Sequence, residues 1–569
     1  MRTITILLLA IIFSAQSIAQ NRRDASWQME DYEMIFDSTG MKAFPRWSEL
    51  DRMDRAVSSI SDDEGILIAY TDGCSVANKN HKLMPNGDSL NFNQPFYDFY
   101  LNCESGYPGG YNIMILPDPE NNSNHYIIHD EISIEIDSAA GAIQLPHEKL
   151  SYSYIDINED NGLGDITEKN IRFFKSRTTM SHLTAISHSN KVDWWIVKPA
   201  FGGEKYYKIL LDENGFSKID SQYIGPRFIT ETDIINPTGV GSSKFSTDGN
   251  RLAYFSLVDG LHIYDFDRET GALSNHKSLD WAPLNSQNIN GDIEFSPSGE
   301  FLYICNRESL FQVDLKEEDL SDGLVKIDDF DDDKSGGLFD YMALGPDCKI
   351  YVRQIGAFQF DFSSINFPDN KGQDCDFRQG NVIMPYPPNL GNFPHFPRFR
   401  VDEEKPCCPA ERTPIESAPT LEGVYCGDWY DTVSEFGERR CDNPAFFTEM
   451  DLYQKGEVEL LHFNRFLNGV GRGGFFDLNG YTVGRSETRD GVFSVYPDSI
   501  QDYEFVRVLG NCDTGFPVCD QPFQCSGLMA DVGDPCDDGD PTTLNDTVNN
   551  FCECEGESIY DCPTLMLDI

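Results

Sequence analysis

The sequence Phe245-Ser-Thr-Asp-Gly-Asn-Arg-Leu-Ala-Tyr254 returns twice in altered form, as Phe295-Ser-Pro-Ser-Gly-Glu-Phe-Leu-Tyr303 and as Leu344-Gly-Pro-Asp-Cys-Lys-Ile-Tyr351. The three copies start 50 and 49 residues apart. In each copy an apolar run ends at a cluster of Gly, Pro, Ser, Thr and Asp, residues that favour chain reversal, and a second apolar run follows. Each copy therefore predicts a strand, a tight turn and a second strand.

The same arrangement occurs three more times upstream in weaker form, at residues 60–70, 113–128 and 186–197. A period of about 40–50 residues with four strands per unit is typical of propeller blades, which bury their faces by stacking around an axis. Few segments hold an apolar period of 3.6 residues, so helices are not expected. We predict an all-β fold with a six- or seven-bladed β-propeller, and a pair of β-sandwiches is the alternative.

Both ends of this predicted propeller carry further signals. Arg2, an apolar run from Ile4 to Phe13 and the small residues Ser17 and Ala19 predict a signal peptide over residues 1–19. This run of about 10 residues is too short to span a bilayer as a helix, and no later stretch reaches the length that a transmembrane segment needs. We therefore expect the propeller to cover residues 20–401 of an exported chain without a transmembrane segment.

The part after the propeller is rich in cysteine. Eleven of the 16 cysteines lie at or beyond Cys407, and in an exported chain this density predicts a disulfide-rich tail. We expect a linker at 402–420, a small β-rich disulfide domain of unknown type at 421–520 and a Cys/Asp-rich repeat module at 521–569. Residues 525–532 recur at 562–569 without the continuation of the first copy, so we expect this module to be truncated.

The net charge of the chain argues against one class of ligand and suggests another. The formal net charge is −50, from 94 Asp and Glu against 44 Lys and Arg. Such a field repels phosphate backbones, so a nucleic-acid partner is not expected. It also suits cation binding, and one acidic turn is the candidate calcium site, with oxygen ligands of the kind Ca²⁺ takes. Its residues are Asp537, Asp538, Asp540, Asn545 and Asp546. The alternative is a solvated acidic turn, since the Glu that ends an EF-hand loop is missing.

Other candidates for chemistry favour structural roles. His125 and His129 are four residues apart in a β-type segment, where their side chains would lie roughly 13 Å apart, too far to share one metal ion. Trp194 and Trp195 could offer a ring to a sugar, but core packing of both is the favoured interpretation. Nucleophile-elbow, phosphate-loop and dinucleotide motifs are absent from the sequence, so no catalytic residue is predicted, and the candidate Ca²⁺ is the one cofactor expected.

Several phrases resemble a known group of proteins. They are Ser61-Asp-Asp-Glu-Gly-Ile-Leu-Ile-Ala-Tyr-Thr-Asp-Gly73, Asn80-His-Lys-Leu-Met-Pro-Asn-Gly87, Asn161-Gly-Leu-Gly-Asp165, Tyr264-Asp-Phe-Asp-Arg-Glu-Thr-Gly271 and Leu390-Gly-Asn-Phe-Pro-His-Phe-Pro-Arg-Phe399. Together they resemble propeller-like exported proteins, with WD- or YVTN-type repeats, of gliding bacteria that use type IX secretion. The Cys-Asp-Asp-Gly-Asp-Pro sequence at 536–541 resembles modules found in the same bacteria. The resemblance implies export and a secreted or surface location, and it implies no catalytic residue.

These observations lead to one functional expectation with two alternatives. We expect a secreted or cell-surface, non-enzymatic binding or display protein whose propeller face engages protein or glycan, with attachment to the outer surface left open. The first alternative is a propeller-based polysaccharide lyase or hydrolase with carboxylates at the axial mouth, since propellers host such chemistry although the fold alone does not imply it. The second alternative is a structural component of the cell surface or matrix.

Overall fold

The computed structural model describes residues 21–401, with gaps at 31, 38–39, 46–47, 51–52, 54, 92–105, 133–134, 138–141, 145–146, 180, 228–240, 258, 280–290, 331–337, 356–360 and 384–390. Beyond residue 401 it describes only the backbone of strands β29–β40. The predicted signal peptide and most of the predicted linker therefore lie outside the described residues.

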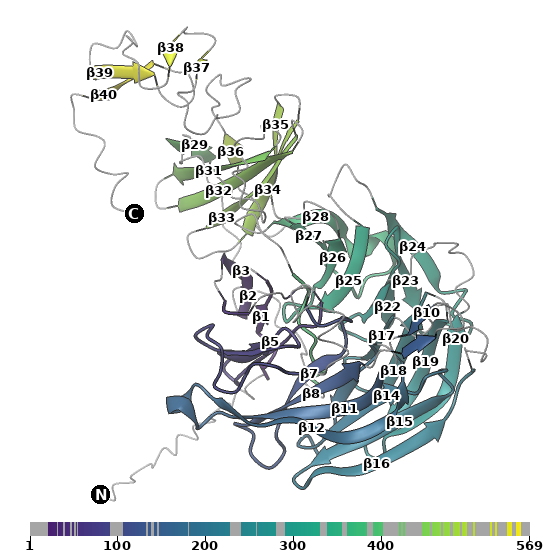
Figure 1. Ribbon diagram of the computed structural model, residues 1–569. Coiled ribbons are helices and arrows are strands. Elements are labelled where there is room, and N and C mark those ends of the chain that lie inside the picture. The colour runs from purple at the N-terminus through teal and green to yellow at the C-terminus, as the bar shows by residue number, and fades with distance from the viewer. Residues whose placement is uncertain are drawn as a thin grey trace, which may run out of the picture.

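Seven antiparallel sheets follow one another along residues 26–383 and form a seven-bladed β-propeller (Figure 1). The first blade contains β1 (Ser26–Gln28), β2 (Tyr32–Asp37) and β3 (Gly40–Pro45), and the second contains β4 (Ser58–Ser61), β5 (Leu67–Thr71) and β6 (Val76–Asn78). The third contains β7 (Ile113–Pro117), β8 (His125–Ile132), β11 (His147–Asp156) and β12 (Asp165–Thr178), with the hairpin of β9 (Glu135–Asp137) and β10 (Ala142–Gln144) inserted.

The remaining four blades each have four strands in sequence order. They are β13 (Thr184–Ser187), β14 (Trp194–Pro199), β15 (Lys205–Asp212) and β16 (Gly215–Tyr223); β17 (Gly241–Phe245), β18 (Arg251–Ser256), β19 (Gly260–Asp267) and β20 (Ala272–Leu279); β21 (Asp292–Phe295), β22 (Phe301–Cys305), β23 (Ser309–Asp314) and β24 (Leu324–Asp329); and β25 (Leu338–Leu344), β26 (Ile350–Ile355), β27 (Asp361–Ile365) and β28 (Phe377–Ile383). Two short 3₁₀ turns, η2 (Asp160–Gly162) and η3 (Gly372–Cys375), complete the described part.

The repeated sequence phrase forms the hairpin between the first two strands of a blade, as predicted. In the fifth and sixth blades the N–H of Gly249 donates to Ser246 at 3.0 Å and that of Gly299 to Ser296 at 2.9 Å. Both glycines have positive φ, +73° and +68°, a conformation that costs glycine little. The seventh blade places Cys348 at the equivalent position with φ 70°. The turn geometry is therefore kept even where glycine is absent.

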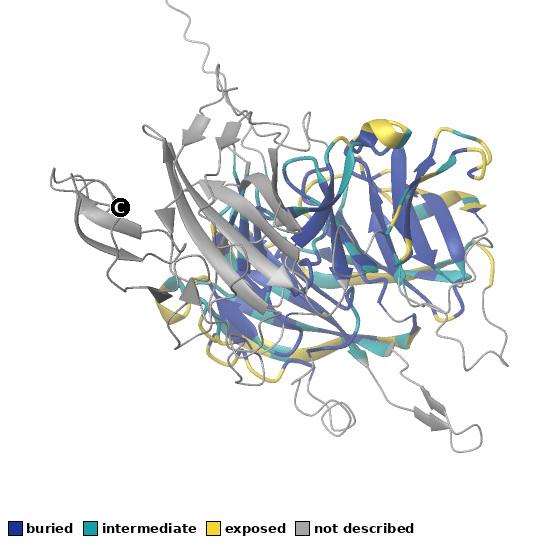
Figure 2. Cartoon of the chain, turned by 90° about the horizontal axis from the view of Figure 1, so that it is seen from above, coloured by how far each residue is buried: buried dark blue, intermediate teal, exposed yellow. Residues whose placement is uncertain are grey.

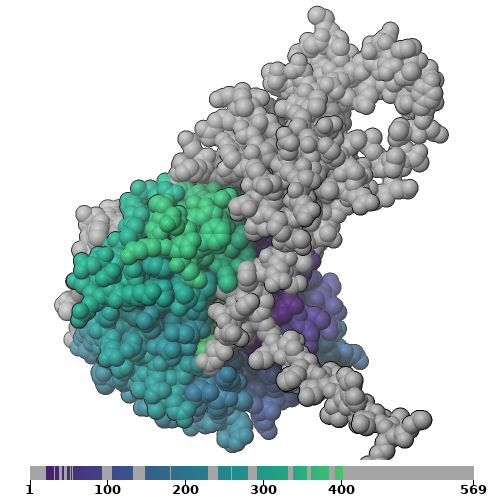
Figure 3. Space-filling model, turned by 180° about the vertical axis from the view of Figure 1, so that it is seen from behind, coloured from purple at the N-terminus to yellow at the C-terminus, as the bar shows by residue number. Residues whose placement is uncertain are grey.

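The first strands of the blades lie innermost, and clusters of buried apolar side chains pack between neighbouring sheets. Most of the described strand residues of the ring are coloured as buried in Figure 2. Trp194 and Trp195 are both buried in it, which confirms the core interpretation of this pair. Colours follow one another around the face seen from behind, from purple through blue and teal to green (Figure 3). The chain thus makes one circuit, and the seventh blade returns to the first.

An aromatic cluster joins the first and seventh blades. Trp27 of β1 lies 4.9 Å from Phe36 of β2 and 5.6 Å from Tyr351 of β26, measured between ring centroids. Phe393, beyond the last blade, lies 5.4 Å from Trp27 and 4.9 Å from Phe362 of β27. All five rings are buried. In the part of the ring that the structure describes, side-chain packing therefore joins the first and seventh blades.

Strands continue beyond residue 401. A six-stranded antiparallel sheet contains β30 (Tyr425–Cys426), β31 (Phe446–Lys455), β32 (Val458–Leu467), β33 (Val470–Asp477), β34 (Thr482–Arg489) and β35 (Val492–Pro497) in that order. β29 (Thr420–Glu422) pairs in parallel with β36 (Glu504–Val506), β37 (Gln524–Cys525) pairs with β38 (Ala530–Asp531), and β39 (Thr543–Val548) pairs with β40 (Cys554–Ser558). The predicted boundaries at 421, 520 and 521 stay predictions.

Candidate functional site: the propeller axis

Residues 391–401, the axial segment, lie among the inner strands of the ring. The N–H of His395 donates to Val57 at 2.7 Å, next to β4, and its Nδ1–H donates to Ile113 of β7 at 2.9 Å. The N–H of Arg398 donates to Ala185 of β13 at 3.3 Å, and its Nε donates to Phe245 of β17 at 2.8 Å. These bonds attach the segment to four neighbouring blades.

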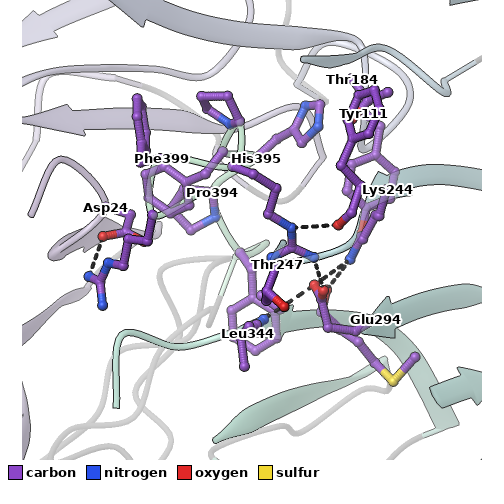
Figure 4. A pocket seen from close by; sticks show the side chains of 18 of the residues that line it. Asp24, Tyr111, Thr184, Lys244, Thr247, Glu294, Leu344, Pro394, His395 and Phe399 are labelled. Carbon is purple, nitrogen blue, oxygen red and sulfur yellow. Dashed lines mark hydrogen bonds and ion pairs between the residues drawn. The ribbon is translucent and has the colours of Figure 1, made fainter. Parts of the chain in front are cut away.

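Two arginine side chains extend these contacts to the other three blades. Arg398 Nη2 pairs with Glu294 of β21. Arg400 Nη1 donates to Pro346, just after β25, at 3.2 Å, and its Nη2 pairs with Asp24, just before β1 (Figure 4). The axial segment therefore contacts an inner strand, or a residue beside one, in each of the seven blades.

Proline explains why this segment is extended. In Phe393-Pro-His-Phe-Pro-Arg398 each of two prolines has a fixed φ and no N–H, and it disfavours helical geometry in the residue before it. The segment makes only an isolated parallel bridge, between Arg398 and Ile186. Its remaining N–H groups and side chains are thus free to reach several blades instead of one strand.

Beside the segment lies a buried group of ionisable side chains, the axial charge cluster. It consists of Tyr111, Lys244, Asp292, Glu294 and Arg398. Lys244 Nζ lies 3.3 Å from Asp292 Oδ2 and 3.1 Å from Glu294 Oε2, and it donates to the carbonyl of Met342 at 2.6 Å. The Tyr111 hydroxyl donates to Asp292 Oδ2. Two cations thus face two carboxylates, which are 0% and 3% exposed.

Backbone N–H groups complete the coordination of both carboxylates. Asp292 accepts from the N–H groups of Ile293 at 2.8 Å and Met342 at 2.7 Å. Glu294 accepts from the N–H groups of Phe295 at 3.0 Å and Leu344 at 3.3 Å. Every oxygen of the two carboxylates therefore accepts a hydrogen bond from the protein itself. Buried carboxylates require such a full set of partners, because a buried charge that loses one is no longer compensated for its loss of hydration.

The protonation states follow from burial and charge. Burial alone would raise the pKa of Glu294, but the charges of Arg398 and Lys244 outweigh it and hold that pKa below its usual range. Burial, with the adjacent charge of Asp292, raises the pKa of Tyr111 well above its usual value. Burial lowers the pKa of His395 to about 3. At neutral pH the cluster therefore holds an ionised Glu294 and a neutral Tyr111, and His395 of the axial segment beside it is neutral.

A cavity of about 80 Å³ opens beside the cluster, lined by Tyr111, Lys244, Glu294 and residues of the axial segment (Figure 4). A cavity of this size holds several water molecules. The arrangement holds the axial segment in the ring and balances its charge. Residues 21–401, as far as they are described, contain no group of three His, Cys, Asp or Glu side chains placed to bind a metal ion.

The structure places the sequence candidates as follows. Asp537, Asp538 and Asp540 lie outside the described residues, and Asn545 and Asp546 are on β39, where only the backbone is described, so the calcium site stays a prediction. His125 and His129 are on strand β8 and fully buried, in agreement with structural roles. Within the described residues, the helices are too short to cross a bilayer.

Sequence reasoning missed the axial charge cluster, although a signal was present. Lys244 and Glu294 directly precede Phe245 and Phe295, the first residues of two successive copies of the repeated phrase. Opposite charges at the same position of neighbouring repeats lie on neighbouring inner strands. A charged residue inside such a strand, where apolar side chains dominate, indicates a buried ion pair.

The seven stacked sheets define this chain as a β-propeller protein. No protein-family model matches the sequence, and no curated protein does. Similar solved structures include a protein of unknown function from Desulfotomaculum acetoxidans, with 12% identity, a TM-score of 0.33, and coverage of 65% of this chain and 98% of that one. A WD40 domain of Toxoplasma gondii coronin has 9% identity and a TM-score of 0.34, and the match covers 78% of this chain and 85% of that domain. A luciferin-regenerating enzyme has 12% identity and a TM-score of 0.25, and the match covers 51% of this chain and 95% of that enzyme. Similarity at this level carries no conclusion about function.

Proposed function

We propose that this chain is a secreted or cell-surface binding protein without catalytic activity, whose propeller engages a protein or a glycan. One observation carries the proposal. The axis, where propellers commonly hold ligands, is occupied by the chain's own residues 391–401, tied to all seven blades. A ring held in this way is a rigid scaffold, and rigid scaffolds present binding loops with little loss of conformational entropy on binding.

Two observations support an exported location. The predicted signal peptide at residues 1–19 would direct export. Cys74 and Cys348 each take part in a disulfide bond, as suits an oxidising compartment, whereas Cys305 and Cys375 are free and buried. Attachment to the outer surface through the Cys-rich tail belongs to the same proposal.

An enzyme is the second candidate, because Asp292 and Glu294 lie in a titratable cluster beside a cavity. Perturbed pKa values near a cavity are common at catalytic centres, but structural ion-pair networks also produce them. Here each carboxylate oxygen is already bonded within the protein. This observation favours the structural role over proton transfer.

The test is a screen of the full chain on glycan and surface-protein arrays, combined with assays for cleavage of the polysaccharides it binds. We expect binding without cleavage, and the same binding for Glu294→Gln wherever circular dichroism shows that the variant is folded. Repeating the screen with EDTA tests the predicted calcium site separately. Turnover that disappears in folded Glu294→Gln would establish the enzyme instead, and absence of any ligand would favour a purely structural component.

A further inference from the structure

The outer strands of the third and fourth blades carry a local excess of positive charge. β12, β15 and β16 together hold seven Lys and Arg but only four Asp and Glu. The whole chain has the opposite balance, with 44 basic and 94 acidic residues. These three strands lie together at the lower rim of the ring in Figure 1. These strands therefore carry more cations than carboxylates of their own, and two of the cations, Lys169 and Arg172, pair with Asp88 and Glu131 of other segments.

Aromatic rings accompany these cations. The guanidinium carbon of Arg177 lies 4.4 Å from the ring centroid of Phe201. Lys205 Nζ lies 4.7 Å from the ring of Tyr207 and 5.3 Å from the ring of Tyr223. Phe201 is 39% exposed and Tyr223 is 71% exposed, high values for side chains of this size. These five residues form what we call the basic aromatic patch.

A backbone connection between the two blades holds the patch together. Thr178, the last residue of β12, pairs with Ala200, which directly follows β14. The N–H of Phe201 donates to the carbonyl of Arg177 at 3.2 Å, and the N–H of Ala200 donates to the carbonyl of Lys205 at 2.7 Å. The residues of the patch are therefore neighbours by backbone geometry, and their side chains need no rearrangement to act together.

We propose that the basic aromatic patch binds an acidic polysaccharide, an inference that rests on the proposed binding function and names its ligand class. The apolar face of a sugar ring packs on an exposed aromatic ring, and Arg and Lys pair with sugar carboxylates. A stable protein interface engages about 20–30 residues on each side, far more than this strip contains. A polysaccharide chain needs only a strip of rings and cations.

The net charge of −50 slows the approach of an anionic polysaccharide, as it does that of a nucleic acid, so the cations of the patch must offset it at contact. At physiological ionic strength charges are screened over about 8 Å, so a bound uronate responds mainly to the cations that touch it. The expected affinity is moderate and falls with added salt. Each surface charge pair contributes up to about fivefold in affinity.

The experiment measures binding of the full chain to polygalacturonate by isothermal titration, with dextran as the neutral polymer. We expect binding to polygalacturonate only. Arg177→Gln with Lys205→Gln should weaken it several-fold, with a ceiling of about 25-fold for the loss of two charge contacts, and Tyr223→Ala should weaken it without changing the charge. Lys326→Gln is the matched control, because Lys326 is an exposed lysine of the sixth blade, paired with Asp329 at 2.7 Å. It should bind like the wild type.

Other outcomes overturn the inference in distinguishable ways. If the wild type does not bind polygalacturonate, or if the double variant binds it equally well, the patch is not the site. Array ligands whose binding survives the double variant would then leave the proposed function standing while this inference falls. A wild-type protein that binds nothing on the arrays or in the titration would contradict both the proposed binding function and the proposed role of the patch.

Discussion

Arg398 connects the axial segment to two blades through one side chain. Its Nε donates to the carbonyl of Phe245, and its Nη2 pairs with Glu294, which is 3% exposed. A buried carboxylate that loses a cation keeps its desolvation cost without compensation. The single side chain therefore matters both for the segment and for the charge balance of the axis.

We expect Arg398→Met to lower the free energy of unfolding by about 3 kcal/mol, because it leaves Glu294 with Lys244 as its remaining cation. Urea unfolding followed by the fluorescence of the buried tryptophans measures the change. Arg378→Met is the control, since Arg378 is 40% exposed and pairs with Asp376 near the surface. The control should cost at most about 1 kcal/mol. If both variants lose the same free energy of unfolding, the buried pair of Arg398 and Glu294 contributes no more to stability than a surface pair.

Buried histidines predict how stability depends on pH. Burial lowers the pKa of His125, His129 and His395 to about 3 each. In the unfolded chain these groups take up a proton below about pH 6.5, while in the folded protein they stay neutral until about pH 3. Their stabilising effect is complete above pH 6.5 and declines as the pH falls toward 3. Each contributes about 1.4 kcal/mol per pH unit.

The free energy of unfolding should therefore fall between pH 6.5 and 5, where most carboxylates are still ionised. Urea titrations at several pH values in this window measure the slope. His395→Gln should reduce the slope by up to about 1.4 kcal/mol per pH unit, whatever its effect on absolute stability, because one of the buried histidines that take up a proton on unfolding is gone. A slope that is unchanged in this variant would contradict a neutral, buried His395.

At the scale of the element, the turn of the repeated phrase has the same conformation in different surroundings. Gly249 and Gly299 occupy equivalent positions with nearly equal φ. A Cβ on Gly249 would lie 2.7 Å from Arg268 Cδ and 2.8 Å from Ile186 Cδ1, whereas a Cβ on Gly299 would meet nothing closer than 3.7 Å. The two positions thus separate backbone strain from steric crowding.

Gly299→Ala should cost about 1 kcal/mol, the strain of a left-handed alanine. Gly249→Ala should cost about 2 kcal/mol more, since the added methyl group must displace packed side chains. Comparing the two variants by thermal and urea unfolding measures the difference. If both variants lose the same free energy of unfolding, the side chains around Gly249 accommodate the added methyl group without destabilising the fold.

At the scale of the whole molecule, none of the described strands is shared between the first and the seventh blade. Every blade takes its strands from one continuous stretch of chain, so β1–β3 and β25–β28 meet as separate sheets. Trp27, Phe36, Tyr351, Phe362 and Phe393 fill the seam between them. The axial segment adds to the closure by bonding to both sides, at Asp24 and Pro346.

Trp27→Ala should therefore loosen the seam and cost about 3–5 kcal/mol, as for other large buried aromatics. Hydrogen exchange should become faster selectively in β1–β3 and β25–β28. Phe266→Ala, a buried ring between the fourth and fifth blades, is the control for a cavity elsewhere. It should lower stability without selective exchange at the seam. Uniform exchange in both variants would show that closure does not depend on the seam.

The sequence by itself determined the blade hairpins, since the turn chemistry of Gly249 and Gly299 is local and recurs at a period of about 50 residues. It left the number of blades at six or seven, because the first blade has no repeated phrase. The buried roles of Trp194, Trp195 and His129 were also predictable from their strand context.

Only the tertiary structure decided what occupies the axis. Residues 391–401 acquire their partners from seven blades that are far apart in the sequence, as the bond between His395 and Val57 illustrates. The pairing of Lys244 with Glu294 likewise needs two neighbouring inner strands to be in place. Local propensity determines turns and strands, but contacts across a closed ring exist only after the ring has formed, so no local pattern encodes them alone.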